Sequence, residues 1–491
     1  MPRRGSADRS RLAFYLLLCW IVLLPWPLGA NRDWIWPWYS AVLLLIAAHS
    51  AWTVDVAARW RMAHPGLRLA LLSLLLLGLL DLLRAIIALP SDDAVWRTAD
   101  PDAGILGALR SSTLCALVFT SMLLLSSRRR VRWLLVSMLA SGVAVALLAL
   151  TLTLTGLTLP WLGHRLGGSE FATGTYINRN HFAGMLELAG AVGFGLLASG
   201  LRATERADSW REWVRRIGHA MLGSRFAVRA ALAVMVVALV MTRSRMGNAA
   251  FFIGLTAAGV ASLIWWRPLP RILIWLLVSI VAIDVLVLGA WVGVDKLAER
   301  VAETHLVAVS PERVSGSDLT SQPATNQSTP AEPDDAERWV VARAGLRLWR
   351  ERPWFGHGPG SFRLLFPAVK PESVGLFYEH AHNDYVQTLV ERGLFGLVLF
   401  LIATASLLFA ALQALRLRGD SLARGLALAT IAASVAFGLH SLVDFNLQIP
   451  ANLFWFQVCL LLGALSHALP VPRPVDRRTS RRITDHDAQH D

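Results

Sequence analysis

Charged residues are scarce in this chain of 491 residues. They make up 16% of it, whereas 55% of the residues are hydrophobic and the mean hydropathy is +0.49. Such a composition excludes a soluble globular protein and is typical of an integral membrane protein. The net charge of +13 is distributed over short basic clusters between apolar runs. That placement favours membrane topology over a groove for nucleic acid.

Cysteine is also nearly absent. Cys19, Cys115 and Cys459 are the only three, and each lies inside an apolar run. The predicted outer loops therefore carry no disulfide and no thiol chemistry. We interpret all three residues as small hydrophobic residues of the core.

Long apolar runs are abundant. A helix needs about 20 apolar residues to cross a hydrocarbon layer of roughly 30 Å. The sequence predicts twelve such spans, near residues 12–30, 35–53, 67–89, 109–127, 132–158, 182–201, 227–243, 247–265, 270–292, 394–415, 422–440 and 450–469. We expect the first run to be a retained anchor, because a second span follows it closely and "PWPLGANRDW" has no convincing small-x-small cleavage site.

The basic clusters predict the orientation of these spans. With the arginine-bearing N-terminus in the cytoplasm, the even-numbered connections should be cytoplasmic too, and these are the connections that carry the clusters, such as "RRRVR" at 128–132. The C-terminal "RPVDRRTSRR" falls on the same side. We therefore predict that both termini are cytoplasmic.

The spans divide the chain into four parts. The prediction is a membrane domain of about nine helices at 1–292, a large outer loop at 293–393, three further helices at 394–470 and a basic tail at 471–491. Within the loop, residues 310–335 are rich in Pro, Ser, Thr and acidic residues and should form a disordered linker. Residues 337–352 alternate apolar residues with arginines and predict an amphipathic helix at the membrane surface, either a lid or a support.

Most of the unusual polar clusters lie on connections predicted to face outward. They are "HRLGGSEFATGTYINRNHFAG" at 164–184, "TRSRMGN" at 242–248, "EHAHNDYVQTLVERGLFG" at 379–396 and "HSLVDFNLQIP" at 440–450. Because these connections face the same compartment, we expect one site to be assembled from several outer loops.

Four outward-facing arginines run against the positive-inside bias. Arg165, Arg179, Arg243 and Arg245 each lie at the mouth of a predicted span, in a chain with only two lysines. A guanidinium group suits bidentate contact with phosphate oxygens, so a membrane-anchored diphosphate is the expected ligand. The alternative is that these side chains reach lipid phosphates without a specific function.

The histidines at the end of the large outer loop admit two kinds of chemistry. His380, His382 and Asp384 alternate and would share one face of an extended strand, as in a metal site. The segment after them is predicted to be helical, and no cysteine or second histidine–carboxylate pair lies nearby, so we predict no metal. A histidine is otherwise suited to general base catalysis or to a structural role.

The spacing around His382 resembles a family motif. His382-Asn383, nine residues, Gly393, two residues and Gly396 match the histidine motif of the O-antigen ligase family, H-[NSQ]-x9-G-x-x-[GTY]. "RLGGSEFATGTYINRNHFAG" is similar to the family's Arg-x-x-Gly…Asn…Ala-Gly stretch, and "TRSRMG" to one of its span boundaries. The resemblance covers most of the membrane domain. It implies an all-α polytopic membrane protein of the GT-C type, with about twelve transmembrane helices, one large periplasmic loop and no cofactor.

The resemblance also implies roles for individual residues. His382 matches the family's essential histidine, and Arg165 and Arg245 best match its two essential arginines, with Arg179 and Arg243 as the respective competitors. The remaining residues expected to bind substrate are Asn180, His181, Asn383, Asp384, Glu379, His440 and Asp444. We expect Glu379, Asp384 or Asp444 to orient His382.

The implied activity is metal-independent, inverting transfer of a glycan from undecaprenyl diphosphate to an acceptor hydroxyl, at the periplasmic face of a bacterial inner membrane. Three acceptors remain open: lipid A–core for a ligase, ranked first; a second lipid-linked repeat unit for a Wzy-like polymerase; and a protein hydroxyl for an O-oligosaccharyltransferase. A transporter of polyprenyl-linked glycans is the alternative from a different class. It would need polar groups at the bilayer midplane, and intramembrane charges are few: Asp81, Arg84, Glu187 and Asp284.

Overall fold

The computed structural model describes residues 4–87, 98–200, 224–267, 278 and 335–471. Within these residues, seven helices are long and apolar enough to cross a membrane. They are α4 (Pro65–Ile87), α5 (Pro101–Leu124), α6 (Arg128–Thr155), α7 (Arg179–Ser199), α10 (Arg245–Trp265), α15 (Asp384–Leu417) and α16 (Ser421–His440). Helices α2 (Trp36–Thr53) and α3 (Val56–Met62), bent by 96° where they meet, make an eighth candidate. The protein is therefore a multi-pass membrane protein.

Three shorter helices complete the correspondence with the predicted spans. They are α1 (Arg4–Leu23), α9 (Ser224–Met241) and α17 (Pro450–Ser466), whose apolar parts have fewer than 18 residues. Every predicted span except 270–292 coincides with a helix, and that span lies almost entirely outside the described residues. The all-α prediction is confirmed, whereas the count of twelve spans is not. The predicted linker and tail lie, apart from residues 335 and 471, outside the described residues as well.

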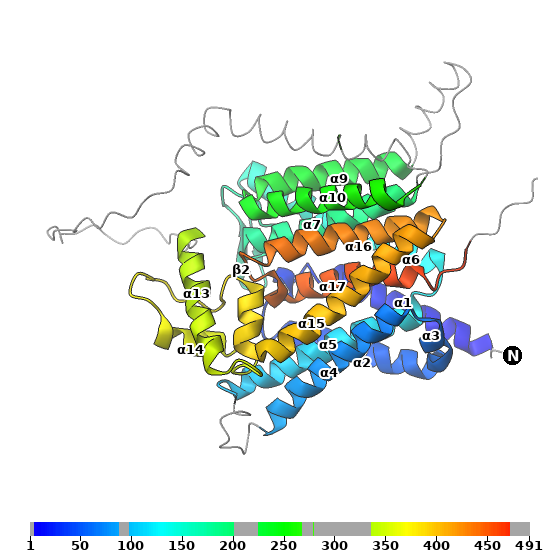
Figure 1. Ribbon diagram of the computed structural model, residues 1–491. Helices are drawn as coiled ribbons and strands as arrows, with labels where there is room; N and C mark the ends of the chain where they lie inside the picture. The colour runs from blue at the N-terminus through cyan, green and yellow to red at the C-terminus, as the bar shows by residue number, and fades with distance from the viewer. Residues whose placement is uncertain (1–3, 88–97, 201–223, 268–277, 279–334, 472–491) are drawn as a thin grey trace, which may run out of the picture.

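The spanning helices lie side by side, with α7 and α17 at the centre of the bundle (Figure 1). Helix α17 is buried along its whole length, and α7 along nearly all of it. Glycines let α7 and α16 approach closely, since a β-carbon on Gly195 would meet the backbone of Gly425. Such small-residue contacts are the usual way in which membrane helices pack without a hydrophobic driving force.

One end of the bundle carries the outer segments. Helices α13 (Asp335–Glu351) and α14 (Phe362–Val369) lie there, and α13 is oriented across the spanning helices (Figure 1). The apolar side of α13 is buried against α14 and α15 in a cluster that includes Val341, Leu348, Phe362, Phe366 and Val390. The helix predicted for 337–352 is thus present, and this apolar side lies inside the protein rather than on a membrane surface.

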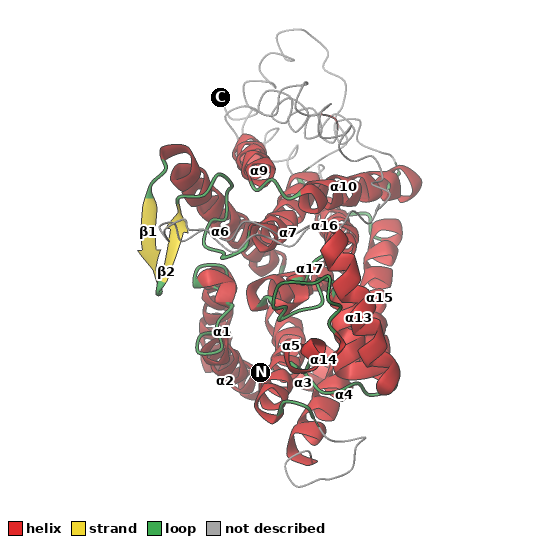
Figure 2. Ribbon diagram, turned by 90° about the vertical axis from the view of Figure 1, so that its left-hand side faces the viewer, coloured by secondary structure: helices red, strands yellow, loops and turns green. Residues whose placement is uncertain are grey.

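A short hairpin is the one sheet within the described part of the chain. Strand β1 (Thr158–Trp161) pairs antiparallel with β2 (His164–Gly167), so that Pro160 lies opposite Arg165. Figure 2 places this hairpin at the edge of the bundle beyond α6, on the other side from α13 and α15.

Arginines from several connections gather at the opposite end of the bundle. Arg128 forms an ion pair with Asp420 at 2.8 Å, Arg418 donates to the carbonyl oxygen of Leu469, and Arg130 donates to Ser10. These residues come from connections that the positive-inside rule assigned to one compartment.

Three charged residues within the spans, Asp81, Arg84 and Glu187, have polar partners in the protein. Asp81 on α4 accepts hydrogen bonds from Arg392 at 3.0 Å and from Ser111 at 2.6 Å. Arg84 donates to the carbonyl oxygens of Phe355 and Gly356. His440 and Glu187 are 2.6 Å apart and join α16 to α7. Asp284 lies outside the described residues.

Candidate active site

The histidine motif is the start of α15, which begins ten residues before the predicted span. Asn383 is the N-cap, and its side-chain oxygen accepts hydrogen bonds from the backbone N–H groups of Tyr385 and Val386, both at 3.0 Å. His382, just before the cap, has a φ of +47°. A left-handed conformation outside glycine costs roughly 1–3 kcal/mol and tends to persist at functional sites. The cap therefore holds His382 in a fixed, strained position.

The structure requires glycine at both glycine positions of the motif. Gly393, with φ +66° and ψ −170°, interrupts α15, and these angles are accessible essentially only to glycine. The glycine-rich segment after α13 supplies hydrogen-bond acceptors at this break. The backbone N–H groups of Leu394 and Phe395 donate to the carbonyl oxygens of Pro353 and Trp354. A β-carbon on Gly396 would collide with the side chain of Arg392.

The loop between α16 and α17 is joined to the start of α15. The backbone N–H of Asp384 donates to Ser441 at 2.9 Å, and the Asn383 side-chain nitrogen donates to the carbonyl oxygen of Leu442 at 2.7 Å. The carboxylate of Asp384 in turn accepts from the N–H of Leu447 at 2.9 Å and the Gln448 amide at 3.3 Å. This network sets the distance between His382 and the residues of the loop.

Asp444, on this loop, lies at the centre of a buried cluster. Its Oδ1 is 3.8 Å from His382 Nδ1 and 3.5 Å from His181 Nε2, and its Oδ2 is 3.9 Å from an Arg338 nitrogen. The Asp444 side chain is 1% exposed and that of His382 10%. Three distant segments, α7, α13 and α15, thus converge on one carboxylate.

An aromatic ring packs among the histidines. The ring of Phe445 lies 4.5 Å from those of His181 and His380 and 4.8 Å from that of His382. Tyr378 contacts His382 from another side at 5.5 Å. The imidazole of His382 is therefore held by packing as well as by its neighbours in the chain.

The electrostatics of the cluster favour a neutral histidine beside an ionised acid. Burial lowers the pKa of His382 to about 4, and the nearby Asp444 carboxylate offsets this only in part. Burial alone would raise the pKa of Asp444, but the adjacent His181, His382 and Arg338 together lower it. Burial and the charge of Arg110 lower the pKa of His380 to about 3. If Nδ1 of His382 carries the proton facing Asp444, Nε2 is available to accept another.

Arginines lie at the starts of two helices, α7 and α10. Arg179 is the first residue of α7, two positions before His181, and its guanidinium lies 4.7 Å from the ring centre of Phe171. Arg245 is the first residue of α10. Arg243, with a φ of +53°, forms an ion pair with Glu170 at 3.0 Å, and Ala172 donates to Met241. The starts of α7 and α10 are thereby tied together, with their partial positive charges at the same end.

The other predicted residues have different surroundings. Arg165 is exposed on the hairpin at the edge of the bundle (Figure 2). Glu379 is exposed, and Asn180 is buried in the first turn of α7. His440 is paired with Glu187, and Asp384 with the loop at Leu447. Of the three acids proposed to orient His382, Asp444 is the one whose carboxylate lies beside it.

Within the described residues, no group of three or more His, Cys, Asp or Glu side chains is placed to hold a metal ion. The chemistry that the cluster offers is proton transfer by a positioned histidine, with arginines and helix starts for an anion.

Comparison with known families identifies the segment that carries the motif. Residues 230–401 match the O-antigen ligase family. This matched segment belongs to that domain family. The matched segment includes Arg243, Arg245 and the whole histidine motif, and its enzymes transfer glycans in ligase-type or polymerase-type reactions. A search of curated proteins found no match to the chain.

The structure adds site residues that the sequence analysis missed. Arg338 approaches Asp444, and Phe445 packs against three histidines. Arg110 lies close enough to lower the pKa of His380. One signal was available, because Arg110 is a charged residue inside an apolar run, and such residues mark functional sites in membrane proteins. Nothing in the local sequence distinguishes Arg338 from the other arginines of α13.

Proposed function

We propose that this O-antigen ligase family member transfers a glycan from undecaprenyl diphosphate to a hydroxyl group of lipid A–core, with inversion at the anomeric carbon and without a metal. The observation that carries the proposal is the buried His382–Asp444 pair at the same end of the bundle as the arginine-bearing starts of α7 and α10. We place this end in the periplasm and the protein in the bacterial inner membrane.

In the proposed reaction, His382 acts as the general base. Nε2 of His382 takes the proton of the acceptor hydroxyl while the oxygen attacks the anomeric carbon of the donor. The bond from that carbon to the diphosphate oxygen breaks, and undecaprenyl diphosphate leaves with the electron pair. Asp444 stabilises the imidazolium that forms, because its carboxylate faces Nδ1 at 3.8 Å.

Arginines would stabilise the leaving diphosphate. Arg179 and Arg245 each begin a helix, so both the guanidinium groups and the helix dipoles favour an anion there. Arg243 is held by Glu170 at the same turn and would contribute to the positive potential. Arg165 would take part only if the β1–β2 hairpin reaches the donor glycan or diphosphate.

Reconstitution tests the donor and the acceptor together. The full-length protein in lipid vesicles is supplied with an undecaprenyl-diphosphate-linked glycan and with lipid A–core. We expect the glycan on lipid A–core and free undecaprenyl diphosphate as the second product. Glycan joined to a second lipid-linked unit would identify a polymerase instead. Movement of the intact donor across the vesicle without transfer would contradict the enzyme assignment.

The pH dependence of transfer tests the state of His382. Because burial lowers the pKa of His382 to about 4, the imidazole remains neutral and able to accept a proton well below neutral pH. We expect kcat/KM to stay level from about pH 8 to about pH 6 and to fall only below about pH 5. A loss of half the activity near the ordinary histidine pKa of about 6.5 would contradict a buried base. Tryptophan fluorescence over the same range checks that the protein stays folded.

A further inference from the structure

A buried ion pair that the proposed reaction does not use joins α7 to α16. Nδ1 of His440 and Oε1 of Glu187 are 2.6 Å apart, and the two side chains are 1% and 0% exposed. The second carboxylate oxygen of Glu187 is buried as well and has no hydrogen-bond partner among the described residues. Ionisable groups inside membrane-spanning helices are costly, and they usually mark a functional role.

Stability does not account for this pair. Replacing a buried ion pair with apolar side chains of similar volume is often neutral or stabilising, because the charges no longer have to be removed from water. The remaining buried residues of α7 and α16 are mostly apolar, and the two helices already pack closely at Gly195 and Gly425. An ion pair differs from apolar packing because its geometry is directional. The contact therefore fixes one position of α7 against α16.

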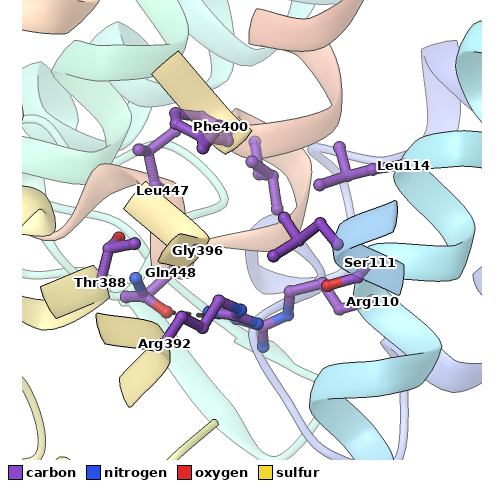
Figure 3. Close-up of a pocket in the computed structure, with 11 residues that line it drawn as sticks. Arg110, Ser111, Leu114, Thr388, Arg392, Gly396, Phe400, Leu447 and Gln448 are labelled. Atoms are coloured by element: carbon purple, nitrogen blue, oxygen red, sulfur yellow. Dashed lines mark hydrogen bonds between the residues drawn. The ribbon is translucent and has the colours of Figure 1, made fainter. Parts of the chain in front are cut away.

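His440 lies in a segment that is bonded to the start of α15. Residues 383–385, which directly follow His382, donate three hydrogen bonds to carbonyl oxygens of residues 438–442, at 2.7–2.9 Å. Figure 3 shows the continuation of this loop against α15, with Gln448 beside Arg392. The end of α16 and the histidine motif thus form one connected unit, and the His440 side chain extends from this unit to α7.

Glu187, the other member of the pair, belongs to the helix whose start carries Arg179 and His181. Helix α16 packs against both α7 and α15 (Figure 1). The position of His382 relative to Arg179 therefore depends on how α16 is held against α7. The His440–Glu187 pair is a short, charged contact at this helix interface.

We propose that His440 and Glu187 are positioning residues of the transfer reaction, which hold the base-bearing start of α15 in register with the arginine-bearing start of α7. The base and the arginines must act on opposite sides of one anomeric carbon, and a displacement of about 1 Å can cost about a hundredfold in rate. This inference rests on the proposed function. It gives His440 a role through Glu187 in place of the substrate contact that the resemblance implies.

Replacing both partners with apolar residues tests the proposal. Glu187→Met combined with His440→Leu keeps the volume of the pair approximately, so the reconstituted protein should unfold at an unchanged or higher temperature. We nevertheless expect kcat for glycan transfer to fall about tenfold or more. KM for the lipid-linked donor should change less than about twofold, because the register matters in the transition state rather than in binding.

Glu187→Gln provides a second variant if the double variant fails to fold. The amide oxygen keeps the shape of the side chain and can still accept a hydrogen bond from His440, whereas the charge is removed. We expect its kcat to lie between those of the unchanged protein and the apolar double variant. This order follows from a directional contact that is weakened in one variant and absent in the other.

The matched control is Arg128→Gln, which breaks the ion pair with Asp420 at the other end of α16. It should leave kcat unchanged. The proposal is overturned if the pair variants keep kcat within about twofold of the unchanged protein. It is also overturned if kcat falls only in proportion to the folded fraction, or if KM alone changes, as for a direct substrate contact. An unchanged protein that transfers no glycan would refute the proposed function, and this inference with it.

Discussion

Replacing His382 with Asn is expected to lower the rate of glycan transfer about a thousandfold, within the range that a general base contributes. Asn is chosen because it tolerates a positive φ better than most residues, and His382 has a φ of +47°. The N-cap at Asn383 and the kink at Gly393 are unaffected, so the protein should fold. Initial rates with the reconstituted protein measure the loss.

The matched control for this variant is His467→Asn. His467 lies at the other end of the bundle, where its ring is 2.9 Å from the carbonyl oxygen of Ala410. It should retain nearly full activity. If His382→Asn transferred glycan at a rate within about fivefold of the unchanged protein, the histidine would not be the base, since proton transfer contributes far more than this.

Asp444→Asn is expected to lower transfer about a hundredfold, because the variant keeps the shape of the side chain and removes its charge. Asp444 is the acid beside His382, His181 and Arg338, and its charge raises the pKa of His382 against the effect of burial. Without that charge the pKa of His382 falls further. The remaining activity should therefore persist to lower pH than in the unchanged protein.

Glu379→Gln separates this role from a general electrostatic effect. Glu379 lies three residues before His382 and is exposed. Its neutralisation should change the transfer rate less than threefold or so, as is usual for an exposed charge. A larger effect at Glu379 than at Asp444, or an unshifted pH profile in Asp444→Asn, would show that Asp444 does not position His382.

The spans could be predicted because bilayer thickness determines their length. Each predicted span within the described residues coincides with a helix, and the amphipathic helix at 337–352 is present as α13. The predicted span begins ten residues after the start of α15, because hydropathy marks only the apolar part of that helix; the polar segment before the span was predicted to be helical, and it is. Asn383 is the cap and Gly393 the break, and the break is stable only because a segment some forty residues earlier in the chain supplies hydrogen bonds to it.

The site was only partly predictable for a related reason. His382 could be recognised from its motif. The arginines of α7 and α10 could be recognised because they lie on the predicted outer side, where the positive-inside rule makes basic residues rare. The choice of Asp444 among three acids depends on how the α16–α17 loop packs against α15. Arg338 and Arg110 come from elements far apart in the chain, and tertiary packing alone brings them to the cluster.

The most direct test of the central claim uses cells whose only copy of this protein carries His382→Asn. The measurement is the length of the glycan that accumulates on undecaprenyl diphosphate in these cells. The account predicts long, fully polymerised chains on the lipid carrier, together with lipid A–core that lacks them. Single repeat units would show that the missing step is polymerisation. Unchanged carrier glycans and normally modified lipid A–core would contradict the assignment of His382 to glycan transfer.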